Sequence, residues 1–349
     1  MKKLLMIGPA SRHLDSYLDL IAGYFEQIAV ISTSREMGKY PTEVIDHEAI
    51  NPSVKSPGSF LGAVETISST IRRFTPDIIH IQQAGTMALA ACLSNRAHKA
   101  PIIITALGSD VLLVPRQGWL QRKMVEHVLN SSDHITCDAQ VSARAVSALL
   151  TRERPVTVVN FGVGPLHDPD IKKEKIVYSN RLHEKLYRID KVLEMFAEFT
   201  ALDPQWKLII AGQGSLTESL KLESARLGLA GKTEFVGWLS PDENIIHYNR
   251  ARIYISIPQV DATSVSLLEA MACDCIPVVS DIPANREWVQ NRINGILCSD
   301  NDEGSLYQAA GLDPVEILRY NRTLLKKMAD RDRSRETFLS IYENYLSRP

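Results

Sequence analysis

The sequence has few cysteines and no long apolar run. Only five of its 349 residues are cysteine, and the close pair Cys273 and Cys275 is separated by a single residue. Zinc sites favour wider spacings and a second pair of ligands, so we predict reduced core thiols of a cytoplasmic protein. No apolar stretch approaches the roughly 20 residues that a membrane-spanning helix needs, so any membrane contact is expected to be peripheral.

The net charge is small, at -2. Lys and Arg number 39, Asp and Glu number 41, and no basic run is interleaved with aromatic residues, so we expect no nucleic-acid partner. The sequence contains no P-loop, no H-E-x-x-H, no G-x-S-x-G, and no G-x-G-x-x-G after its first apolar run. The D-x-D triplet at residues 330–332 falls in a charged stretch that we predict to be a solvated helix. We therefore expect no metal site.

Short apolar runs rich in Ile and Val alternate with longer amphipathic stretches, a pattern typical of buried parallel strands joined by helices. The first run stops at Gly8, too early for a signal peptide, and is predicted to be a strand. A polar stretch at 167–175 divides the runs into two sets. The first set is Leu4–Ile7, Ile28–Ile31, Ile78–Ile81, Ile102–Thr105, Ile135–Cys137 and Val156–Val159. The second set is Ile176–Tyr178, Lys207–Ala211, Thr233–Val236, Ile253–Ser256, Pro277–Ser280 and Gly295–Cys298.

This division predicts two doubly wound α/β domains. We expect a first domain over residues 1–165, a second over 166–325, and a C-terminal helix within 326–349 that packs back on the first domain. Ligands of such sheets bind at the carboxyl ends of the strands, and two domains in series can place these ends around one cleft. The strand ends are therefore where functional residues are expected.

The stretch Asp261–Ala272 follows a predicted strand and has the pattern of a helix start. Thr263 and Ser264 are good N-cap residues, and the chain from Val265 onward is apolar with helical spacing. The unpaired N–H groups and partial positive charge of such a helix end form a site for phosphate. Glu269 lies one to two turns along, where a carboxylate could accept hydrogen bonds from vicinal hydroxyls, as on a ribose. The alternative is a plain cap followed by a solvated acid.

The same stretch resembles the E-x7-E signature of retaining glycosyltransferases of the family 4 type, usually followed by E-A-M-A-x-G-x-P-V-V. Here residues 268–279 read Leu-Glu-Ala-Met-Ala-Cys-Asp-Cys-Ile-Pro-Val-Val, and Glu287 follows. Two departures are Asp261 for the first glutamate and Asp274 for the usual glycine. The resemblance implies the GT-B fold, two Rossmann-like doubly wound domains facing a central cleft, with the first acid near the donor sugar and its phosphate.

Two cations after the strand Ile176–Tyr178 look like the family's strand-end arginine and lysine, which hold the donor diphosphate. They are Arg181 and Lys185. A fixed guanidinium and ammonium can stabilise the charge of a departing diphosphate without a metal. Aligning the following helix puts Tyr187 at the usual lysine position, so Lys185 is the preferred second cation and Arg188 the reserve. The alternative is that these are exposed charges at a helix start.

Two glycines that end strands of the second set complete the donor side. Gly212 resembles the family's turn where the backbone approaches the nucleotide, and Gly237 resembles the later strand end whose main chain contacts the base. Both residues also suit simple turns.

On the first domain the resemblance is carried by Pro76–His80 and Thr105–Val111, similar to the P-D-h-h-H and T-x-H-G-S-D segments of the family. Leu107 replaces the usual histidine, which removes one family contact near the reacting sugar. His80 suits a structural histidine as well as a site residue. The candidates for the acceptor side are Gly8, His13, Gly108, Ser109 and Asp110. Ser109 and Asp110 also suit a plain helix cap, and His13 also suits a structural histidine.

The resemblance implies retaining transfer of a sugar from a nucleoside diphosphate sugar, with UDP or GDP as carrier, to an acceptor hydroxyl. It implies no metal or other cofactor, and a saccharide or lipid-linked saccharide acceptor in polysaccharide or glycoconjugate biosynthesis. A lipid-linked acceptor would place a cytoplasmic protein at the inner face of the membrane. Competing interpretations are a nucleotide-sugar epimerase or phosphorylase on the same fold, a two-domain ligand-binding protein without turnover, and, more weakly, an NAD-dependent oxidoreductase.

Overall fold

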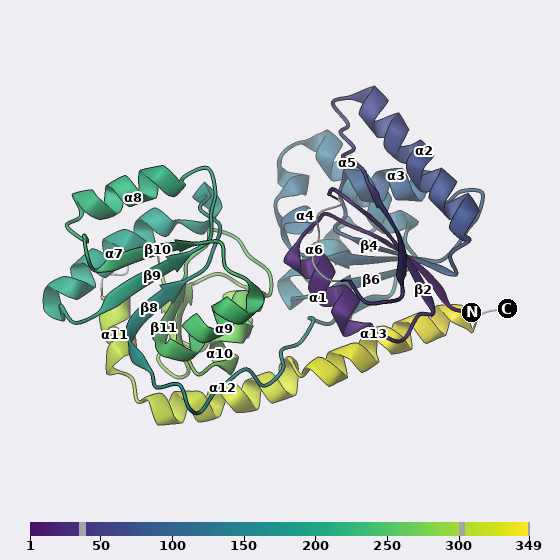
Figure 1. Cartoon of the computed structure of the whole chain (residues 1–349). Coiled ribbons are helices and arrows are strands. Elements are labelled where there is room, and N and C mark those ends of the chain that lie inside the picture. The colour runs from purple at the N-terminus through teal and green to yellow at the C-terminus, as the bar shows by residue number, and fades with distance from the viewer. Residues whose placement is uncertain (35–39, 300–303, 348–349) are drawn as a thin grey trace. The chain divides into compact units, whose positions relative to one another are not determined.

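The computed structural model describes residues 1–34, 40–299 and 304–347, which form two compact units (Figure 1). The first unit combines Met1–Phe161 with the segment that begins at Arg331, and the second spans Gly162–Asp330. The chain thus passes between units a few residues from the boundaries predicted at 165 and 325. Both units are α/β structures built on a parallel sheet.

The seven strands of the first sheet run in the order β3-β2-β1-β4-β5-β6-β7. Six of them coincide with the predicted apolar runs, and β3 was not predicted. It lies at the sheet edge, pairs with β2, and consists largely of polar or partly exposed residues, so it lacks the continuous apolar run of a buried strand. The strands are β1 (Lys3–Ile7), β2 (Gln27–Ser32), β3 (Val44–Ala49), β4 (Ile78–Gln82), β5 (Ile102–Ala106), β6 (His134–Cys137) and β7 (Val156–Val158).

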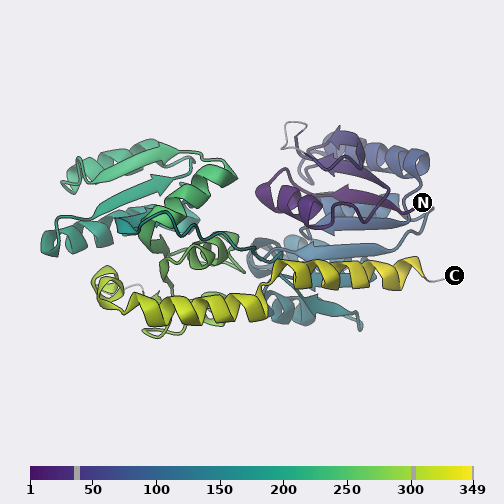
Figure 2. The same cartoon turned by 60° about the horizontal axis from the view of Figure 1, so that its bottom comes forward.

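Helices cover the first sheet, and the last helix of the chain is one of them (Figure 2). Phe338, Ile341 and Tyr342 of this helix are buried against side chains of α1, β1 and β2, so residues more than 300 positions apart share one core. The helices are α1 (Arg12–Leu20), α2 (Pro57–Phe74), α3 (Thr86–Ser94), α4 (Ser109–Leu112), the 3₁₀ turn η1 (Val114–Arg116), α5 (Trp119–Ser131), α6 (Gln140–Leu149) and α13 (Arg331–Leu346).

His80 connects β4 to the last helix through a buried polar cluster. Its Nδ1 lies 2.5 Å from the hydroxyl of Tyr342 and 3.1 Å from that of Tyr17, and its Nε2 lies 2.7 Å from Thr105 Oγ1. Burial lowers the pKa of His80 from its ordinary value of 6.5 to about 3, with a smaller effect of His134. Of the two interpretations of His80, these contacts favour the structural one.

The second sheet has the order β10-β9-β8-β11-β12-β13. All six strands coincide with predicted runs. They are β8 (Glu174–Ser179), β9 (Lys207–Ala211), β10 (Thr233–Gly237), β11 (Ala251–Ser256), β12 (Ile276–Ser280) and β13 (Ile296–Cys298). The helices are η2 (Lys185–Tyr187), α7 (Ile189–Leu202), α8 (Thr217–Arg226), α9 (Pro241–Arg250), α10 (Val265–Ala272), η3 (Asn285–Glu287), α11 (Ser305–Gly311) and α12 (Pro314–Met328). Along the described parts of the chain, no helix is both long and apolar enough to cross a membrane.

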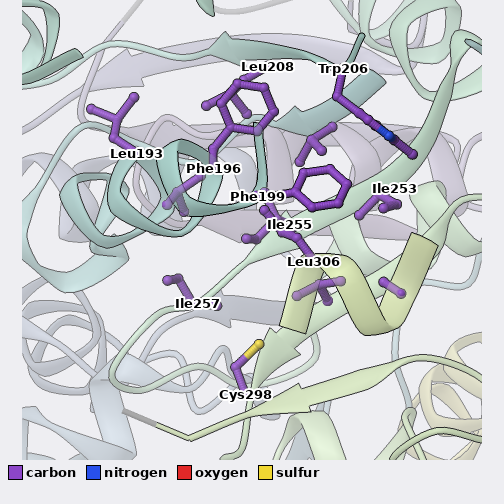
Figure 3. Close-up of a cluster of buried hydrophobic side chains, with 14 of the residues drawn as sticks. Leu193, Phe196, Phe199, Trp206, Leu208, Ile253, Ile255, Ile257, Cys298 and Leu306 are labelled. Atoms are coloured by element: carbon purple, nitrogen blue, oxygen red, sulfur yellow. The ribbon is translucent and has the colours of Figure 1, made fainter. Parts of the chain in front are cut away.

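Each face of the second sheet is covered by its own set of helices. On one face, Phe196 and Phe199 of α7 pack with Trp206 and with aliphatic side chains of β8, β9 and β11 (Figure 3). Full burial of a Phe or large aliphatic side chain contributes roughly 1.5–3 kcal/mol relative to an exposed one. On the other face, α9, α10 and α12 pack on Ile176, Tyr178 and their neighbours. This second layer carries the polar residues of the candidate site.

Asp274, at the position where the family usually has glycine, lies just after α10 with a φ of +61°. A left-handed residue explains the usual glycine, and aspartate is among the side chains that tolerate this conformation. Its buried carboxylate accepts two hydrogen bonds from the Arg322 guanidinium and lies 3.2 Å from His167 Nδ1. The substitution therefore exchanges glycine's freedom for an ionic contact with α12. All five cysteines are buried and none is in a disulfide, as predicted.

The lowered pKa of His80 predicts a loss of stability in mild acid. The unfolded chain takes up a proton as pH falls below 6.5 whereas folded His80 stays neutral until about pH 3, so stability should fall across this window. This group contributes a slope of at most about 1.4 kcal/mol per pH unit. We expect urea unfolding, followed by circular dichroism between pH 7 and 5, to show a shallower slope for His80→Gln than for the wild type.

The control is His127→Gln, which changes an exposed histidine of α5. It should keep the wild-type slope. Equal slopes for His80→Gln and the wild type would contradict the assignment.

Candidate active site

The strand order of the second sheet reverses between β8 and β11. From β8 the chain adds β9 and β10 on one side, and then β11, β12 and β13 on the other. Neighbouring strands that lead to opposite sides leave a crevice at their carboxyl ends, where ligands of doubly wound sheets bind. The register pairs Tyr178 of β8 with Tyr254 of β11. The loops that follow these strands, 180–188 and 257–264, therefore start side by side.

Arg181, from the first of these loops, is fixed by three groups. Its Nη2 donates to Asp261 Oδ2 at 2.8 Å, its Nη1 donates to Ser264 Oγ at 2.5 Å, and the guanidinium lies over the ring of Tyr187, 4.5 Å from the centroid. The side chains of Arg181 and Asp261 are only 11% and 20% exposed. The guanidinium is therefore held in one orientation beside the start of α10.

The electrostatics keep this arginine charged. Burial by itself would lower the pKa of Arg181, but Asp261 and the nearby tyrosines Tyr254 and Tyr187 outweigh that effect and leave the pKa raised. A partly buried, permanently charged guanidinium with a fixed plane is suited to bidentate contact with an anion such as phosphate.

The start of α10 agrees with the predicted helix start. Ser264 is the N-cap, and its Oγ accepts from Leu267 N at 3.4 Å. Thr263 is buried, and its Oγ1 accepts from Trp288 Nε1 at 3.3 Å, so it anchors the loop to the core. The N–H groups of Val265 and the next residue precede the capped amide and have no partner inside the helix. Together with Arg181 they form a positive locus.

Glu269 faces the same layer, one turn farther along α10. Its Oε2 accepts a hydrogen bond from the hydroxyl of Tyr248 in α9 at 3.2 Å, and the side chain is partly buried. The alternative of a solvated helix acid is therefore wrong. Tyr248 in turn accepts from Asn180 Nδ2 at 2.6 Å, and Asn180 immediately precedes Arg181. The structure thus brings Glu269 and Arg181 into one connected group.

Gly212 lies against the loop that carries Arg181, and Gly237 is bonded to Gly212. Their φ values are +110° and +74°, and Gly212 N donates to Gly237 O at 2.7 Å. A Cβ atom on Gly212 would lie 2.5 Å from the carbonyl oxygen of Arg181, too close for any other residue. Glycine is therefore required here by a close approach of two backbones, which also positions Arg181.

Lys185 is not part of this group. It lies in η2 with an exposed side chain, and among the described residues its ammonium makes no ion pair with Asp261. Arg188 instead ties the two loops together, because its Nε donates to the carbonyl oxygen of Ile257 at 2.7 Å. Tyr187, at the usual lysine position of the family, supplies the aromatic face under Arg181.

The candidates of the first unit follow β1 and β5. A Cβ on Gly8 would lie 3.0 Å from the Cβ of Gln82, so the chain passes close to β4 here. His13, in the first turn of α1, has its ring edge-on to Phe161 at 6.1 Å, and its carbonyl accepts from Gln82 Nε2 at 3.4 Å. Neither residue is joined by a described contact to Asp110.

Gly108, Ser109 and Asp110 form the turn after β5. Gly108 has a φ of +102° and precedes α4, which begins at Ser109. The carboxylate of Asp110 is buried and accepts from Ala84 N at 2.8 Å and Leu107 N at 3.2 Å. Burial raises the pKa of Asp110, although these main-chain N–H groups oppose the effect. Asp110 thus joins the loops after β4 and β5, a stronger structural role than the simple cap that was the alternative.

Two site residues were missed in the sequence. Tyr187 was noted as a departure from the family, and its stacking on Arg181 could have been suspected from that position. Tyr248 carries no local signal, because it lies 21 residues before Glu269 on a different helix. Only the packing of α9 beside α10 brings the two side chains together.

Comparisons with known proteins identify the family of both units. A family model described as "Glycosyl transferase 4-like" matches residues 4–139, and one described as "Glycosyl transferases group 1" matches residues 167–310. The alpha-monoglucosyldiacylglycerol synthase of Streptococcus pneumoniae is 23% identical over 252 residues, 65% of this chain and 56% of that protein's length. The N-acetyl-alpha-D-glucosaminyl L-malate synthase of Bacillus anthracis is 23% identical over 309 residues, 82% of this chain and 75% of that protein.

Among solved structures, Anabaena HepE in complex with UDP and glucose superposes with a TM-score of 0.82. The match covers 99% of this chain and 100% of that one at 14% sequence identity, and therefore shows a shared fold. One family model on each Rossmann-like unit, together with these relatives, leads to one conclusion: the chain belongs to the family 4-like, group 1 glycosyltransferases, which have the GT-B fold.

Proposed function

We propose that this glycosyltransferase uses a nucleoside diphosphate sugar as donor, transfers the sugar with retention of configuration, and needs no metal ion. The observation that carries the proposal is the guanidinium of Arg181, fixed by Asp261 and Ser264 beside the start of α10. A charged donor group next to unpaired helix N–H groups is a site for a diphosphate.

The chemistry assigned to this locus is stabilisation of the leaving group. As the bond between the anomeric carbon and the diphosphate breaks, negative charge grows on the phosphate oxygen. A guanidinium that is already oriented stabilises that charge without reorganising, which is the basis of electrostatic catalysis. Asp261 keeps Arg181 in place and is assigned to contact the donor sugar, and exposed Lys185 is assigned a secondary attraction for the diphosphate.

The nucleoside is assigned to the residues on either side. Glu269, which is partly buried and accepts from Tyr248, is assigned to accept hydrogen bonds from the ribose hydroxyls. The backbone turn formed by Gly212 and Gly237 is assigned to the base. UDP is the first carrier to test, because the related Anabaena structure contains UDP and glucose, and GDP is the second.

The acceptor is assigned to the first unit, where Gly8 and His13 follow β1, Gly108 and Ser109 follow β5, and Asp110 joins the loops after β4 and β5. We propose a saccharide or lipid-linked saccharide acceptor in polysaccharide or glycoconjugate synthesis by a cytoplasmic enzyme. The pneumococcal relative is named for a diacylglycerol glycolipid, which supports testing a lipid acceptor and peripheral contact with the inner face of the membrane.

The donor class is tested by a thermal-shift screen of UDP, GDP and ADP and their sugars. A ligand present at about 100 times its dissociation constant stabilises a protein by about 2.7 kcal/mol. A hit should then support sugar transfer to an acceptor with release of the free nucleoside diphosphate. Isomerisation of the donor sugar without release would favour an epimerase instead.

Transfer should survive chelation, because Arg181 and the start of α10 supply positive charge for the leaving diphosphate. We expect the rate in excess EDTA to match the rate without it. The measurement is initial velocity with the identified donor, with and without added manganese. Complete loss of transfer in EDTA, restored by manganese, would contradict a metal-free mechanism.

The two arms of the site, Arg181 for the diphosphate and Glu269 for the ribose, should respond differently to mutation. Arg181→Ala is expected to lose on the order of 10²–10³ in kcat, because removal of one preorganised donor weakens the transition state. Glu269→Gln should chiefly raise the donor KM, since the ribose is held equally in ground and transition states. Steady-state kinetics with circular dichroism as a folding check measures both effects.

The control is Arg250→Ala, which removes an arginine paired with Glu174 at the opposite, amino end of β8. This variant should keep wild-type kinetics. Folded Arg181→Ala and Glu269→Gln enzymes with unchanged kinetics would show that the assignment of both arms is wrong.

A further inference from the structure

A buried polar cluster lies beneath the candidate site, in the layer between the second sheet and its helices. It contains three tyrosines, from β8, α9 and β11, that are fully buried, and two asparagines. The members are Tyr178, Tyr248, Tyr254, Asn180 and Asn244. A cluster of this kind is costly to bury unless its hydrogen bonds are satisfied, so each bond has a defined direction.

Asn180 is the centre of the cluster. Its Nδ2 donates to Tyr248 Oη at 2.6 Å and to Asn244 Oδ1 at 2.8 Å, and its Oδ1 accepts from Tyr254 Oη at 3.2 Å. Both hydrogens of the amide and its oxygen are therefore engaged. The side chain that immediately precedes Arg181 is thereby fixed to α9 and β11.

These bonds determine what the hydroxyl of Tyr248 can do. Its oxygen accepts from Asn180, and Ser266 is a further hydrogen-bond neighbour that favours the ionised phenol and so acts as a donor, which leaves the single proton of Tyr248 for Glu269 Oε2 at 3.2 Å. Donation from the amide also polarises the hydroxyl and strengthens the bond to the carboxylate. Burial, and then the charge of Glu269, raise the pKa of Tyr248 far above its ordinary value, so the phenol stays a donor at any working pH.

We propose that Tyr248, oriented by Asn180, is a positioning residue that holds the carboxylate of Glu269 toward the ribose hydroxyls of the donor. This inference rests on the proposed function, in which Glu269 binds ribose. Tyr248 holds the carboxylate through a hydrogen bond to Oε2, and an ionised carboxylate accepts several hydrogen bonds. Because Asn180 adjoins Arg181, the same cluster sets the spacing between the diphosphate arm and the ribose arm of the site.

The test compares two ligands that differ only in the ribose hydroxyls, UDP and 2′,3′-dideoxyuridine 5′-diphosphate. We expect Tyr248→Phe to weaken UDP binding about tenfold, the usual effect of losing a hydrogen bond to a charged group. Affinity for the dideoxy ligand should change by less than about twofold. Isothermal titration calorimetry on the full chain measures both affinities, and circular dichroism confirms folding.

The matched control is Tyr178→Phe. It removes an equally buried tyrosine hydroxyl from the same cluster, one that donates to Asn244 Oδ1 at 2.7 Å. This variant should keep the wild-type preference for UDP over the dideoxy ligand. General loosening of the cluster would instead weaken the two ligands alike in both variants.

The outcomes separate this inference from the function on which it rests. If Glu269→Gln loses the preference for ribose hydroxyls and Tyr248→Phe keeps it, or weakens both ligands equally, the role of Tyr248 is overturned and the ribose site stands. If Glu269→Gln keeps the full preference, the ribose assignment itself fails. If the wild type binds none of UDP, GDP and ADP, the proposed donor class fails, and the inference fails with it; if GDP or ADP binds in place of UDP, its dideoxy form is used.

Discussion

The contact of Arg181 with Asp261 and Ser264 is the interaction on which the candidate site depends. It joins the loop after β8 to the loop and helix that follow β11, across the point where the sheet order reverses. The bond from Arg188 to the carbonyl oxygen of Ile257 and the backbone bond from Gln259 N to Leu186 O link the same two loops. The contact with Asp261 and Ser264 holds the positively charged guanidinium of Arg181 beside the start of α10.

Several neighbouring residues hold Arg181 and its loop in position. The left-handed glycine at 212 allows its own backbone to approach the carbonyl of Arg181. Tyr187 covers one face of the guanidinium, and Arg188 bonds the backbone of the opposite loop. Asn180, directly before Arg181, anchors the chain to α9 and β11. A single arginine is thus held by contacts to main chain, aromatic ring, hydroxyl and carboxylate.

Much of the fold could be predicted because buried parallel strands appear in the sequence as short, nearly continuous apolar runs. Twelve strands appeared as short runs of mainly apolar residues, since the inner strands of each sheet are buried on both faces. The missed strand, Val44–Ala49, lies at an edge, where polar side chains face solvent. The start of α10 could also be predicted, because Ser264 acts within its own turn. Signals of this kind are local and are therefore readable in sequence.

The rest required the three-dimensional structure, because the contacts join distant segments. Nothing near Tyr248 indicates that its hydroxyl bonds Glu269, and nothing near Asp274 indicates its partner Arg322 on α12. Lys185 was predicted from its charge and its place in the chain, but its side chain is exposed on η2. The residue of this turn that contacts Arg181 is Tyr187. Residue type predicts which chemistry is available, whereas packing decides which side chains meet.

The most direct test of the central claim compares how Arg181 affects a nucleoside and its diphosphate. Calorimetry with wild-type and Arg181→Ala chains would measure binding of the diphosphate identified by screening and of the matching nucleoside. If Arg181 holds the diphosphate, the variant should bind the diphosphate about 10–100-fold more weakly, as expected for loss of charge-assisted hydrogen bonds, and bind the nucleoside as the wild type does. An unchanged ratio of the two affinities in a folded variant would contradict the account.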